Sequence, residues 1–226
     1  MTYLIIGASA SLGIEIAKEL SKDGYVYLLS RKDLTKKLKE NIVMHVVSDY
    51  MAEDITSTLK DISEVKELTV IFMNALSDRK AFYLLSDEDI KNPIEVNVLL
   101  PLKLTRDILR ERMERITKFV YLSSSRALKG DVGITMYSAS KGALVSATKC
   151  LAMEYARFNK EFYVLSLGLL SSGLANTLKK ETAEKIIENT AARKFVSTGD
   201  VLSAIRNIAD NSYMNGSVVK VDYGYF

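Results

Sequence analysis

Short apolar runs and longer amphipathic stretches alternate along the whole chain. The apolar runs are rich in β-branched and aromatic residues and occupy residues 3–7, 25–30, 42–48, 68–74, 118–124, 161–167 and 217–223. They are nearly continuous, which is typical of strands buried on both faces of a parallel sheet. The stretches between them predict helices at residues 12–24, 51–65, 87–115, 137–159, 179–191 and 199–210, the first closing on Gly24 as a C-terminal cap.

This order of elements predicts one α/β domain. Strands that alternate with helices form βαβ units, and such units build a doubly wound parallel sheet with helices on both faces. Seven strands occupy residues 1–226 without a Pro/Gly-rich linker, a low-complexity segment or a repeat. We therefore expect a single domain around a seven-stranded parallel sheet. The least regular segment, residues 168–198, is the candidate for a loop and helix that cover a substrate.

Composition narrows the classes of partner. The chain has 226 residues, 48% of them hydrophobic and 26% charged, with a net charge of +3. That charge is too mild to indicate a nucleic-acid partner. No apolar run approaches the roughly 20 residues of a membrane span, and the N-terminus lacks a signal-peptide pattern. We expect a cytoplasmic protein that binds neither nucleic acid nor a membrane.

Cysteine and histidine are almost absent from the chain. One histidine, His45, makes a histidine-rich metal site improbable, and we expect no metal. One cysteine, Cys150, excludes an intramolecular disulfide. Its helical context predicts a small buried hydrophobic residue rather than a nucleophile.

The sequence GASASLG connects the first predicted strand to the first predicted helix. Gly7 permits a sharp turn and Gly13 a close approach, while Ser9 and Ser11 add hydroxyl groups. The N–H groups at the start of a helix are suited to binding a pyrophosphate. Ser11 stands where a dinucleotide-binding turn commonly has its middle glycine. Taken alone, this turn favours a cofactor site and a plain strand-to-helix turn equally.

The end of the second predicted strand favours NADP(H) over NAD(H). A dinucleotide fold that uses NAD places an acid there, about 20 residues beyond the glycine turn. Here the position is the neutral Ser30, followed by Arg31 and Lys32. A 2′-phosphate binds cations, and arginine offers a fork of donors to it. The alternative is a basic loop exposed to water.

Asp49 follows the third predicted strand and can accept a hydrogen bond from an adenine amino group. Aspartate at such a place is also a common turn residue or helix cap, so Asp49 alone does not favour a cofactor.

Residues 123–144, SSSRALKGDVGITMYSASKGAL, carry the candidate chemistry. Tyr137 and Lys141 lie four residues apart in a predicted helix and therefore on one face. A tyrosine normally loses its proton near pH 10, and an ammonium group beside it, together with an oxidised nicotinamide, would bring that pKa toward neutrality. Such a tyrosine serves as a general acid or base. Ser124 ends a strand at the carboxyl edge, where ligands of such sheets bind, and can polarise a carbonyl oxygen.

Asn97 is a polar residue in an otherwise apolar helical stretch. It is either a satisfied core or capping amide or part of a site. In an α-helix the N–H of residue 101 would bond to the carbonyl of residue 97, but Pro101 has no N–H. The carbonyl of Asn97 is therefore predicted to be free to bind another group, such as a water.

Together these residues resemble the short-chain dehydrogenase/reductase family, in its short single-domain branch. The resemblance runs the length of the chain: the glycine turn, MNA at 73–75, Asn97, LSS before YSASK, SLGLLSSG after the sixth strand, and NGSVVKVDYGY near the end. It implies a Rossmann-like fold and hydride transfer between NADP(H) and a small ketone or alcohol substrate. At family level it suggests a 3-oxoacyl substrate. It also implies homodimers or homotetramers built partly from the helices at about 93–115 and 137–159.

The resemblance assigns roles to particular residues. Tyr137 would protonate the ketone oxygen and Ser124 would hold it. Lys141 would bind the nicotinamide ribose and lower the tyrosine pKa, while Asn97 would hold a proton-relay water through its carbonyl. The implied cofactor contacts are Gly7, Ser9, Ser11, Leu12, Gly13, Ser30, Arg31, Lys32, Asp49, Tyr50, Asn74, Ala75, Tyr137, Lys141, Gly168, Leu170 and Ser172.

The sequence departs from the family pattern at four places, and none of them removes a reacting group. They are Ser11 for the middle glycine, Ile6 for the preceding threonine, Leu76 for a glycine after MNA, and Leu167 for the proline before Gly168, with Ser172 at the usual threonine position. Two alternatives remain. A non-catalytic dinucleotide sensor is disfavoured by the retention of Tyr137 and Lys141. A sugar-nucleotide epimerase or dehydratase is disfavoured because only 58 residues follow Gly168, too few for its substrate domain.

Overall fold

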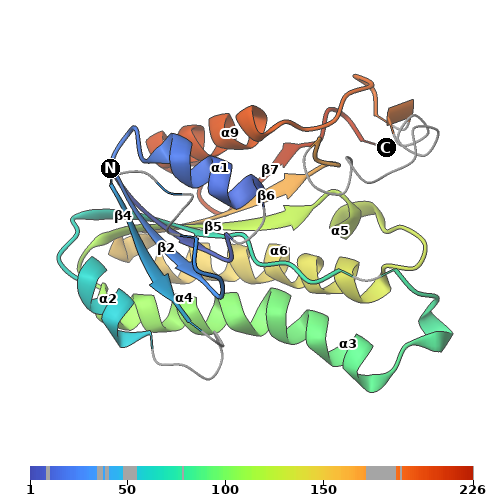
Figure 1. The fold of residues 1–226 in the computed structure, drawn as a ribbon, viewed down its shortest axis with the longest axis horizontal. Coiled ribbons are helices and arrows are strands. Elements are labelled where there is room, and N and C mark those ends of the chain that lie inside the picture. The colour runs from blue at the N-terminus through green and yellow to red at the C-terminus, as the bar shows by residue number, and fades with distance from the viewer. Residues whose placement is uncertain are drawn as a thin grey trace.

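A computed structural model describes residues 1–8, 11–34, 38, 41–47, 55–77, 79–171, 187–188 and 190–225. One parallel sheet forms its centre (Figure 1), and its strands are β1 (Thr2–Ile6), β2 (Tyr25–Ser30), β3 (Ile42–Val46), β4 (Glu67–Phe72), β5 (Ile116–Ser124), β6 (Lys160–Leu167) and β7 (Val218–Val221). Their spatial order is β3-β2-β1-β4-β5-β6-β7, and all neighbours pair in parallel. The predicted doubly wound seven-stranded sheet is confirmed.

Helices cover both faces of the sheet. The helices α1 (Ser11–Leu20) and α9 (Thr198–Asp210) pack together on one face, and α2 (Thr56–Ile62), α4 (Leu100–Glu111) and α6 (Thr135–Tyr155) supply residues to the core on the other. Figure 1 shows α1 and α9 above the sheet and α4 and α6 below it. Each face therefore has its own hydrophobic core.

The strand β1 shows why its apolar run is continuous. Tyr3 and Ile5 belong to the core beneath α1 and α9, whereas Leu4 and Ile6 belong to the core beneath α4 and α6. Successive side chains of a strand point to opposite faces, so a strand with two covered faces has no exposed position along its middle.

The predicted helix at 87–115 is three consecutive segments. These are α3 (Asp87–Ile94), the π-helical turn η3 (Glu95–Leu99) and α4, where the N–H of Leu100 bonds to the carbonyl of Glu95, five residues back. The change coincides with Pro101, which cannot supply the N–H that would continue an α-helical ladder through Asn97.

The predicted C-terminal cap at Gly24 is wrong. The helix α1 ends at Leu20, and Gly24 immediately precedes β2. The N–H of Tyr25 donates to the Met1 carbonyl at 3.2 Å, and a Cβ on Gly24 would lie 1.9 Å from that oxygen. Glycine is required there because the start of the chain passes directly over it.

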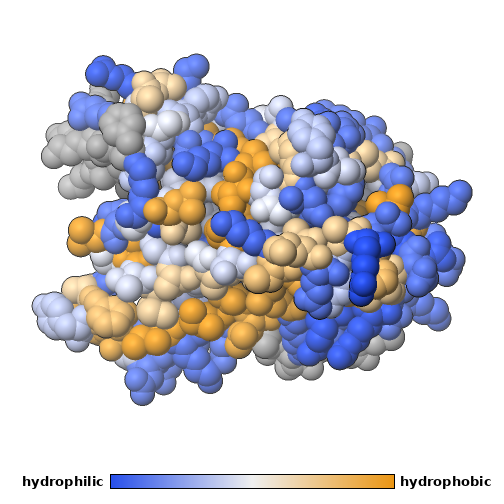
Figure 2. Space-filling view, turned by 180° about the vertical axis from the view of Figure 1, so that it is seen from behind, coloured by the Kyte–Doolittle hydropathy of each residue, from blue (hydrophilic) through white to orange (hydrophobic). Residues whose placement is uncertain are grey.

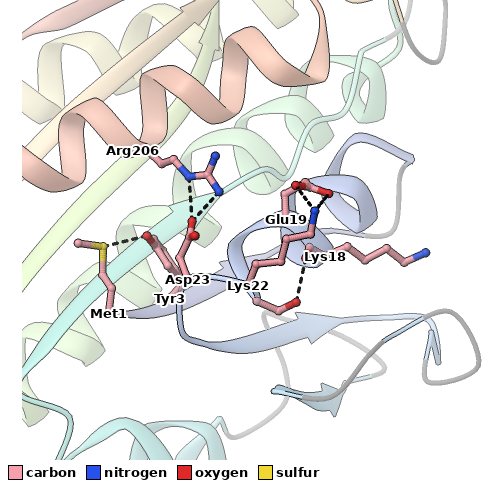
Figure 3. Close-up of polar contacts among 8 residues, drawn as sticks. Met1, Tyr3, Lys18, Glu19, Lys22, Asp23 and Arg206 are labelled. Carbon is pink, nitrogen blue, oxygen red and sulfur yellow. Dashed lines mark hydrogen bonds and ion pairs between the residues drawn. The ribbon is translucent and has the colours of Figure 1, made fainter.

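The turn between α1 and β2 is tied to α9 by an ion pair. The Nε and a terminal nitrogen of Arg206 donate to one carboxylate oxygen of Asp23 at 2.8 and 2.6 Å (Figure 3). Nearby, the hydroxyl of Tyr3 donates to the sulfur of Met1 at 2.8 Å. These contacts lie at the amino edge of the sheet, opposite the edge that carries the candidate site.

The predicted burial of Cys150 is also wrong, because its side chain is exposed on α6. A groove of about 520 Å³ runs between α4 and α6, and Cys150 lines it together with Leu102, Thr105, Arg106, Leu109, Arg110, Met113, Ala147, Leu151 and Tyr155. Figure 2 shows a band of apolar surface from the lower left to the centre of the molecule, in the half that holds α3, α4 and α6 in Figure 1. The helix α6 therefore has apolar side chains on its outer side as well as toward the sheet.

The remaining helical elements are short: η2 (Phe82–Leu84), α5 (Arg126–Lys129), η4 (Ala156–Phe158) and η5 (Ser212–Met214). The predicted helix at 179–191 lies mostly outside the described residues, as do 51–54 of the predicted helix at 51–65. Among the described residues, no helix is long and apolar enough to cross a membrane.

Candidate active site

The predicted site residues gather at the carboxyl edge of the sheet. Gly7 follows β1, Ser30 ends β2, Asn74 lies just beyond β4, Ser124 ends β5 and Gly168 follows β6. Because all the strands are parallel, their carboxyl ends meet at one edge. The strand order reverses between β1 and β4, and ligands of open α/β sheets bind in the crevice at such a reversal.

The two glycines of the first turn are required by close packing. Gly7 has a φ of +84°, and a Cβ there would lie 2.7 Å from the backbone nitrogen of Asn74. A Cβ on Gly13 would lie 2.5 Å from the Cα of Ala8. Glycine at these positions lets β1, the turn and α1 approach one another. Ser11 is the exposed first residue of α1, and Leu12 is buried behind it.

Two cations stand at the end of β2. Ser30 is buried, and its hydroxyl accepts a hydrogen bond from the N–H of Lys32 at 3.1 Å. Arg31 and Lys32 are both exposed. A neutral, inward-turned side chain is thus followed by two accessible positive charges. Four of the predicted cofactor contacts, Ser9, Asp49, Tyr50 and Ser172, lie outside the described residues.

Asn97 is a fully buried amide whose side chain joins two parts of the chain. Its Oδ1 accepts from the N–H of Leu76 at 2.7 Å, and its Nδ2 donates to the Leu76 carbonyl and to the Ser140 hydroxyl, both at 2.9 Å. Of the two alternatives that the sequence left open for Asn97, its side chain matches the amide with all its hydrogen bonds satisfied in the core. It holds the segment after β4 against α6. That its carbonyl binds a water stays a prediction.

Asn74 lies between β4 and the π-helical turn. Its Nδ2 donates to the carbonyl of Val96, and its own carbonyl accepts from Lys141. Its Oδ1 is buried and has no hydrogen-bond partner among the described residues. Ala75, next along the chain, is exposed. A buried amide oxygen without a partner is costly, so this atom points to a donor that completes the site.

Lys141 is buried, and its Nζ donates to the carbonyls of Asn74 at 3.0 Å and Leu122 at 2.8 Å. Burial lowers its pKa from 10.5 to about 7. An ammonium group has three donors, so one N–H remains beyond these two bonds.

The Ser124 side chain lies close enough to Tyr137 to act on its hydroxyl group. Burial raises the pKa of Tyr137, while Ser124 and the positive charge of Arg126 oppose the rise. The sequence predicted that Lys141 would lower this pKa. In the structure the Lys141 ammonium is directed at two carbonyls, and the cation that acts on Tyr137 is Arg126.

The sequence reasoning missed two serines that position the site. The buried Ser140 hydroxyl donates to the Tyr137 carbonyl at 2.7 Å while accepting from Asn97. The hydroxyl of Ser123 donates to the Lys141 carbonyl at 3.1 Å. The one available signal was local, since Ser140 lies three residues after Tyr137 and hence on the same helical face.

The far side of the site is closed by the segment after β6. The N–H of Gly168 donates to the Val221 carbonyl at 2.9 Å, and a Cβ on Gly168 would lie 2.9 Å from the Cα of Asp222. Leu170 pairs with Val196 in an isolated parallel bridge. The two ends of the predicted substrate-covering segment, 168–198, are therefore joined, while 172–186 and 189 lie outside the described residues.

These polar groups together fit a dinucleotide. A glycine-permitted turn leads into the N-terminus of α1 at the strand-order reversal, accessible cations follow β2, and a lysine N–H and an unpartnered amide oxygen lie beyond β4. Such groups suit a pyrophosphate, a phosphorylated ribose and a second ribose with its base. Within the described part of the chain, no three His, Cys, Asp or Glu side chains are grouped as a metal site.

Comparison with known proteins decides the family. The model of the short chain dehydrogenase family matches residues 1–183. The chain belongs to the short-chain dehydrogenase family. Among curated relatives, the 3-oxoacyl-[acyl-carrier-protein] reductase FabG of Rickettsia felis is 27% identical over 234 residues, covering 99% of this chain and 95% of that protein. Nodulation protein G of Rhizobium sp. (strain N33) is 24% identical, covering 98% and 95%.

Solved structures of this family have the same fold. ElxO with NADP bound has a TM-score of 0.89 at 21% identity, covering 99% of this chain and 98% of that one. An actinorhodin polyketide ketoreductase variant with NADPH has a TM-score of 0.89 at 21% identity, covering 100% and 97%. At this identity the likeness shows the fold, which confirms the Rossmann-like architecture.

Proposed function

We propose that this short-chain dehydrogenase is an NADP(H)-dependent carbonyl reductase, which in reverse oxidises a secondary alcohol. The observation that carries the proposal is the meeting of Ser124, at the end of β5, with Tyr137 near the start of α6, with the buried Lys141 one helical turn further on. Two neighbouring hydroxyl groups can both reach one substrate oxygen. The catalytic residues are then Ser124, Tyr137, Lys141 and Asn97.

The roles follow from the surroundings of each group. A reduced nicotinamide, when bound, supplies the hydride that the carbonyl carbon receives. Ser124 holds the carbonyl oxygen, and Tyr137 donates its proton to that oxygen as negative charge develops. Burial keeps Tyr137 protonated and therefore ready to act as an acid. Lys141 uses its remaining N–H toward the ribose, and Asn97 keeps the segment after β4 fixed against α6.

The preference for NADP(H) rests on the end of β2. Arg31 and Lys32 are exposed there, and Ser30 replaces the acid that would bind a ribose diol. Similar solved structures carry NADP or NADPH, although a mutant of 4-hydroxyisoleucine dehydrogenase, with a TM-score of 0.90, carries NADH. The residues of this chain therefore carry the argument.

Titration with NADPH and NADH tests the cofactor. Arg31→Gln should weaken NADPH binding by about tenfold or more and leave NADH binding unchanged, because a charge-assisted bond to the 2′-phosphate is lost. Lys66→Gln is the matched control, since Lys66 is an exposed cation at the amino edge of the sheet. Equal affinity of the wild type for both dinucleotides would refute the phosphate assignment.

A panel of ketones tests the chemistry. Tyr137→Phe should lower kcat at least about a hundredfold, since it removes the general acid. Tyr213→Phe, which alters a highly exposed tyrosine, should retain the wild-type rate. Reduction that survives Tyr137→Phe would refute the mechanism. Dinucleotide binding without turnover of any ketone would favour a dinucleotide-sensing protein instead.

The assembly that we propose is a homodimer or homotetramer formed through α4 and α6. The groove between these helices is lined mainly by apolar side chains, and Met153 is exposed on α6. Exposed apolar surface of this kind is typical of an interface between subunits. Sedimentation of the wild type and of Met153→Asp, which changes an exposed residue of α6, should give an oligomer and a smaller species respectively. A monomeric wild type would refute the proposal.

A further inference from the structure

We propose that Arg126 is a specificity-determining residue that binds a carboxylate of the substrate, so that the enzyme reduces oxo acids in preference to their neutral esters. This inference rests on the proposed function, because it names the substrate class of the same site. It is carried by the position of Arg126, the orientation of its guanidinium group and the charge balance around it.

Arg126 stands beside the two proposed hydroxyl groups. It is the first residue of α5, two residues after Ser124, and its N–H donates to the Ser124 hydroxyl at 3.2 Å. Its positive charge acts on the Tyr137 hydroxyl, where it opposes the rise of the pKa. A substrate oxygen held by Ser124 and Tyr137 therefore lies in the field of this guanidinium group.

The guanidinium group is anchored at one end only. Its Nε is shielded from solvent and lies 3.1 Å from a carboxylate oxygen of Asp131 as an ion pair, but it donates no hydrogen bond to any described residue; 24% of the side chain is exposed. No described residue accepts a hydrogen bond from its two terminal nitrogens. A guanidinium group that is held near Asp131 by charge, and whose nitrogens have no described acceptor, is available to bind a planar carboxylate.

The charged groups around Arg126 leave one positive charge in excess. The same oxygen of Asp131 accepts from Arg79 at 2.7 Å, so two arginines share one carboxylate. The neighbouring acid Asp89 is already paired with Lys80 at 2.6 Å. Two arginines therefore face the single carboxylate of Asp131, and an incoming group with a single negative charge completes this pairing. A carboxylate has that charge.

The alternative is a purely structural ion pair that fixes the loop after α5. Arg79 separates the two interpretations, because it binds the same oxygen of Asp131 but its charge is not among the influences on Tyr137. Loss of a structural clamp would be felt equally in Arg79→Gln and Arg126→Gln. Loss of a substrate contact would be felt only in Arg126→Gln.

The kinetic test compares 2-oxopentanoate, 3-oxopentanoate and 4-oxopentanoate with their methyl esters. The wild type should reduce one of the acids with a kcat/KM about 10- to 100-fold above that of its ester, the effect of a hydrogen bond to a charged group. Arg126→Gln should bring this ratio close to one, mainly by raising KM for the acid. Arg126→Lys should keep part of the ratio, because it keeps the charge but not the fork. Arg79→Gln should keep it whole.

A wild type that reduces acids and esters equally well would overturn the proposal, as would an equal loss of the ratio in Arg79→Gln and Arg126→Gln. A binding experiment separates this inference from the proposed function. Saturation-transfer NMR measures the binding of pentanoate, and pentanamide is the neutral control. If no ketone is reduced but Arg126→Gln abolishes pentanoate binding, the anion site stands and the reductase proposal fails. Pentanoate binding that Arg126→Gln leaves unchanged overturns the anion site.

Discussion

Replacing Ser140 by alanine should destabilise the protein, whereas the same change at Ser138 should not. Both serines lie in α6, two residues apart. The Ser140 hydroxyl is fully buried and bonds to the Asn97 amide at 2.9 Å and the Tyr137 carbonyl at 2.7 Å. The Ser138 hydroxyl is buried too but has no hydrogen-bond partner among the described residues. Comparing the two variants therefore measures how much the buried hydrogen bonds of Ser140 contribute to the free energy of unfolding.

The expected size follows from the bonds that are lost. Ser140→Ala leaves one N–H of the Asn97 amide buried and unsatisfied, which costs about 1–3 kcal/mol. Alanine is the better helix former by about 0.5 kcal/mol, so the net loss in the free energy of unfolding is about 0.5–2.5 kcal/mol. Ser138→Ala removes no bond and should gain about 0.5 kcal/mol. The two variants should therefore differ by about 2 kcal/mol.

Urea denaturation of both variants measures this difference, with the m-value as the check that unfolding remains comparable. Hydrogen exchange gives a local measurement. The N–H of Leu76 is held by the Asn97 side chain, so it should exchange faster in Ser140→Ala and at the wild-type rate in Ser138→Ala. Unfolding free energies that agree within about 0.5 kcal/mol would refute the reasoning, since the Ser140 bond would then contribute nothing.

Three further predictions concern charge. The pKa of Lys141 is about 7 in the folded chain and ordinarily 10.5, so between these pH values the unfolded chain binds one proton more than the folded chain. The unfolding free energy of the wild type should therefore rise with pH, relative to that of Lys141→Met, by up to about 1.4 kcal/mol per pH unit. Urea titrations from about pH 7 to 9 measure this rise. Arg126→Gln removes a charge that lowers the Tyr137 pKa, so the pH above which ketone reduction slows should move upward in a pH–rate profile. Arg112→Met should lower the unfolding free energy measured in urea by about 3 kcal/mol or more, because the buried Arg112 donates to several backbone carbonyls. Asp23→Asn should lower it by less than about 1 kcal/mol, because the ion pair of Asp23 with Arg206 is exposed.

The sheet could be predicted from the sequence because its signal is local. Each strand is a continuous apolar run, and β1 shows that both faces of such a run are covered. The exact ends of elements depend on contacts between distant residues. The sequence predicted a helix cap at Gly24 because Met1, which occupies the space above Gly24, is far away in the sequence. It predicted a buried Cys150 because the sequence does not distinguish a helix position that faces the core from one that faces a groove on the outer surface.

The site divides in the same way. The positions of Asn97, Ser124, Tyr137 and Lys141 follow from their motif and spacing. Their contacts do not, since Asn97 reaches Leu76 and Ser140, which are 21 and 43 residues away in the sequence. Spacing placed a lysine beside a tyrosine but could not show where the ammonium group points.

Lys141 is the residue whose burial most needs a function to explain it. Its ammonium group is removed from water and donates hydrogen bonds to two backbone carbonyls. Among the described residues, no carboxylate pairs with it. A methionine of similar length would pack in the same space without the desolvation that lowers the lysine pKa to about 7. Stability alone therefore disfavours lysine here. We expect its third donor, together with the neighbouring Asn74 oxygen that has no described partner, to serve a bound ligand, because Lys141 lies on the same helix as Tyr137 rather than at a remote part of the fold.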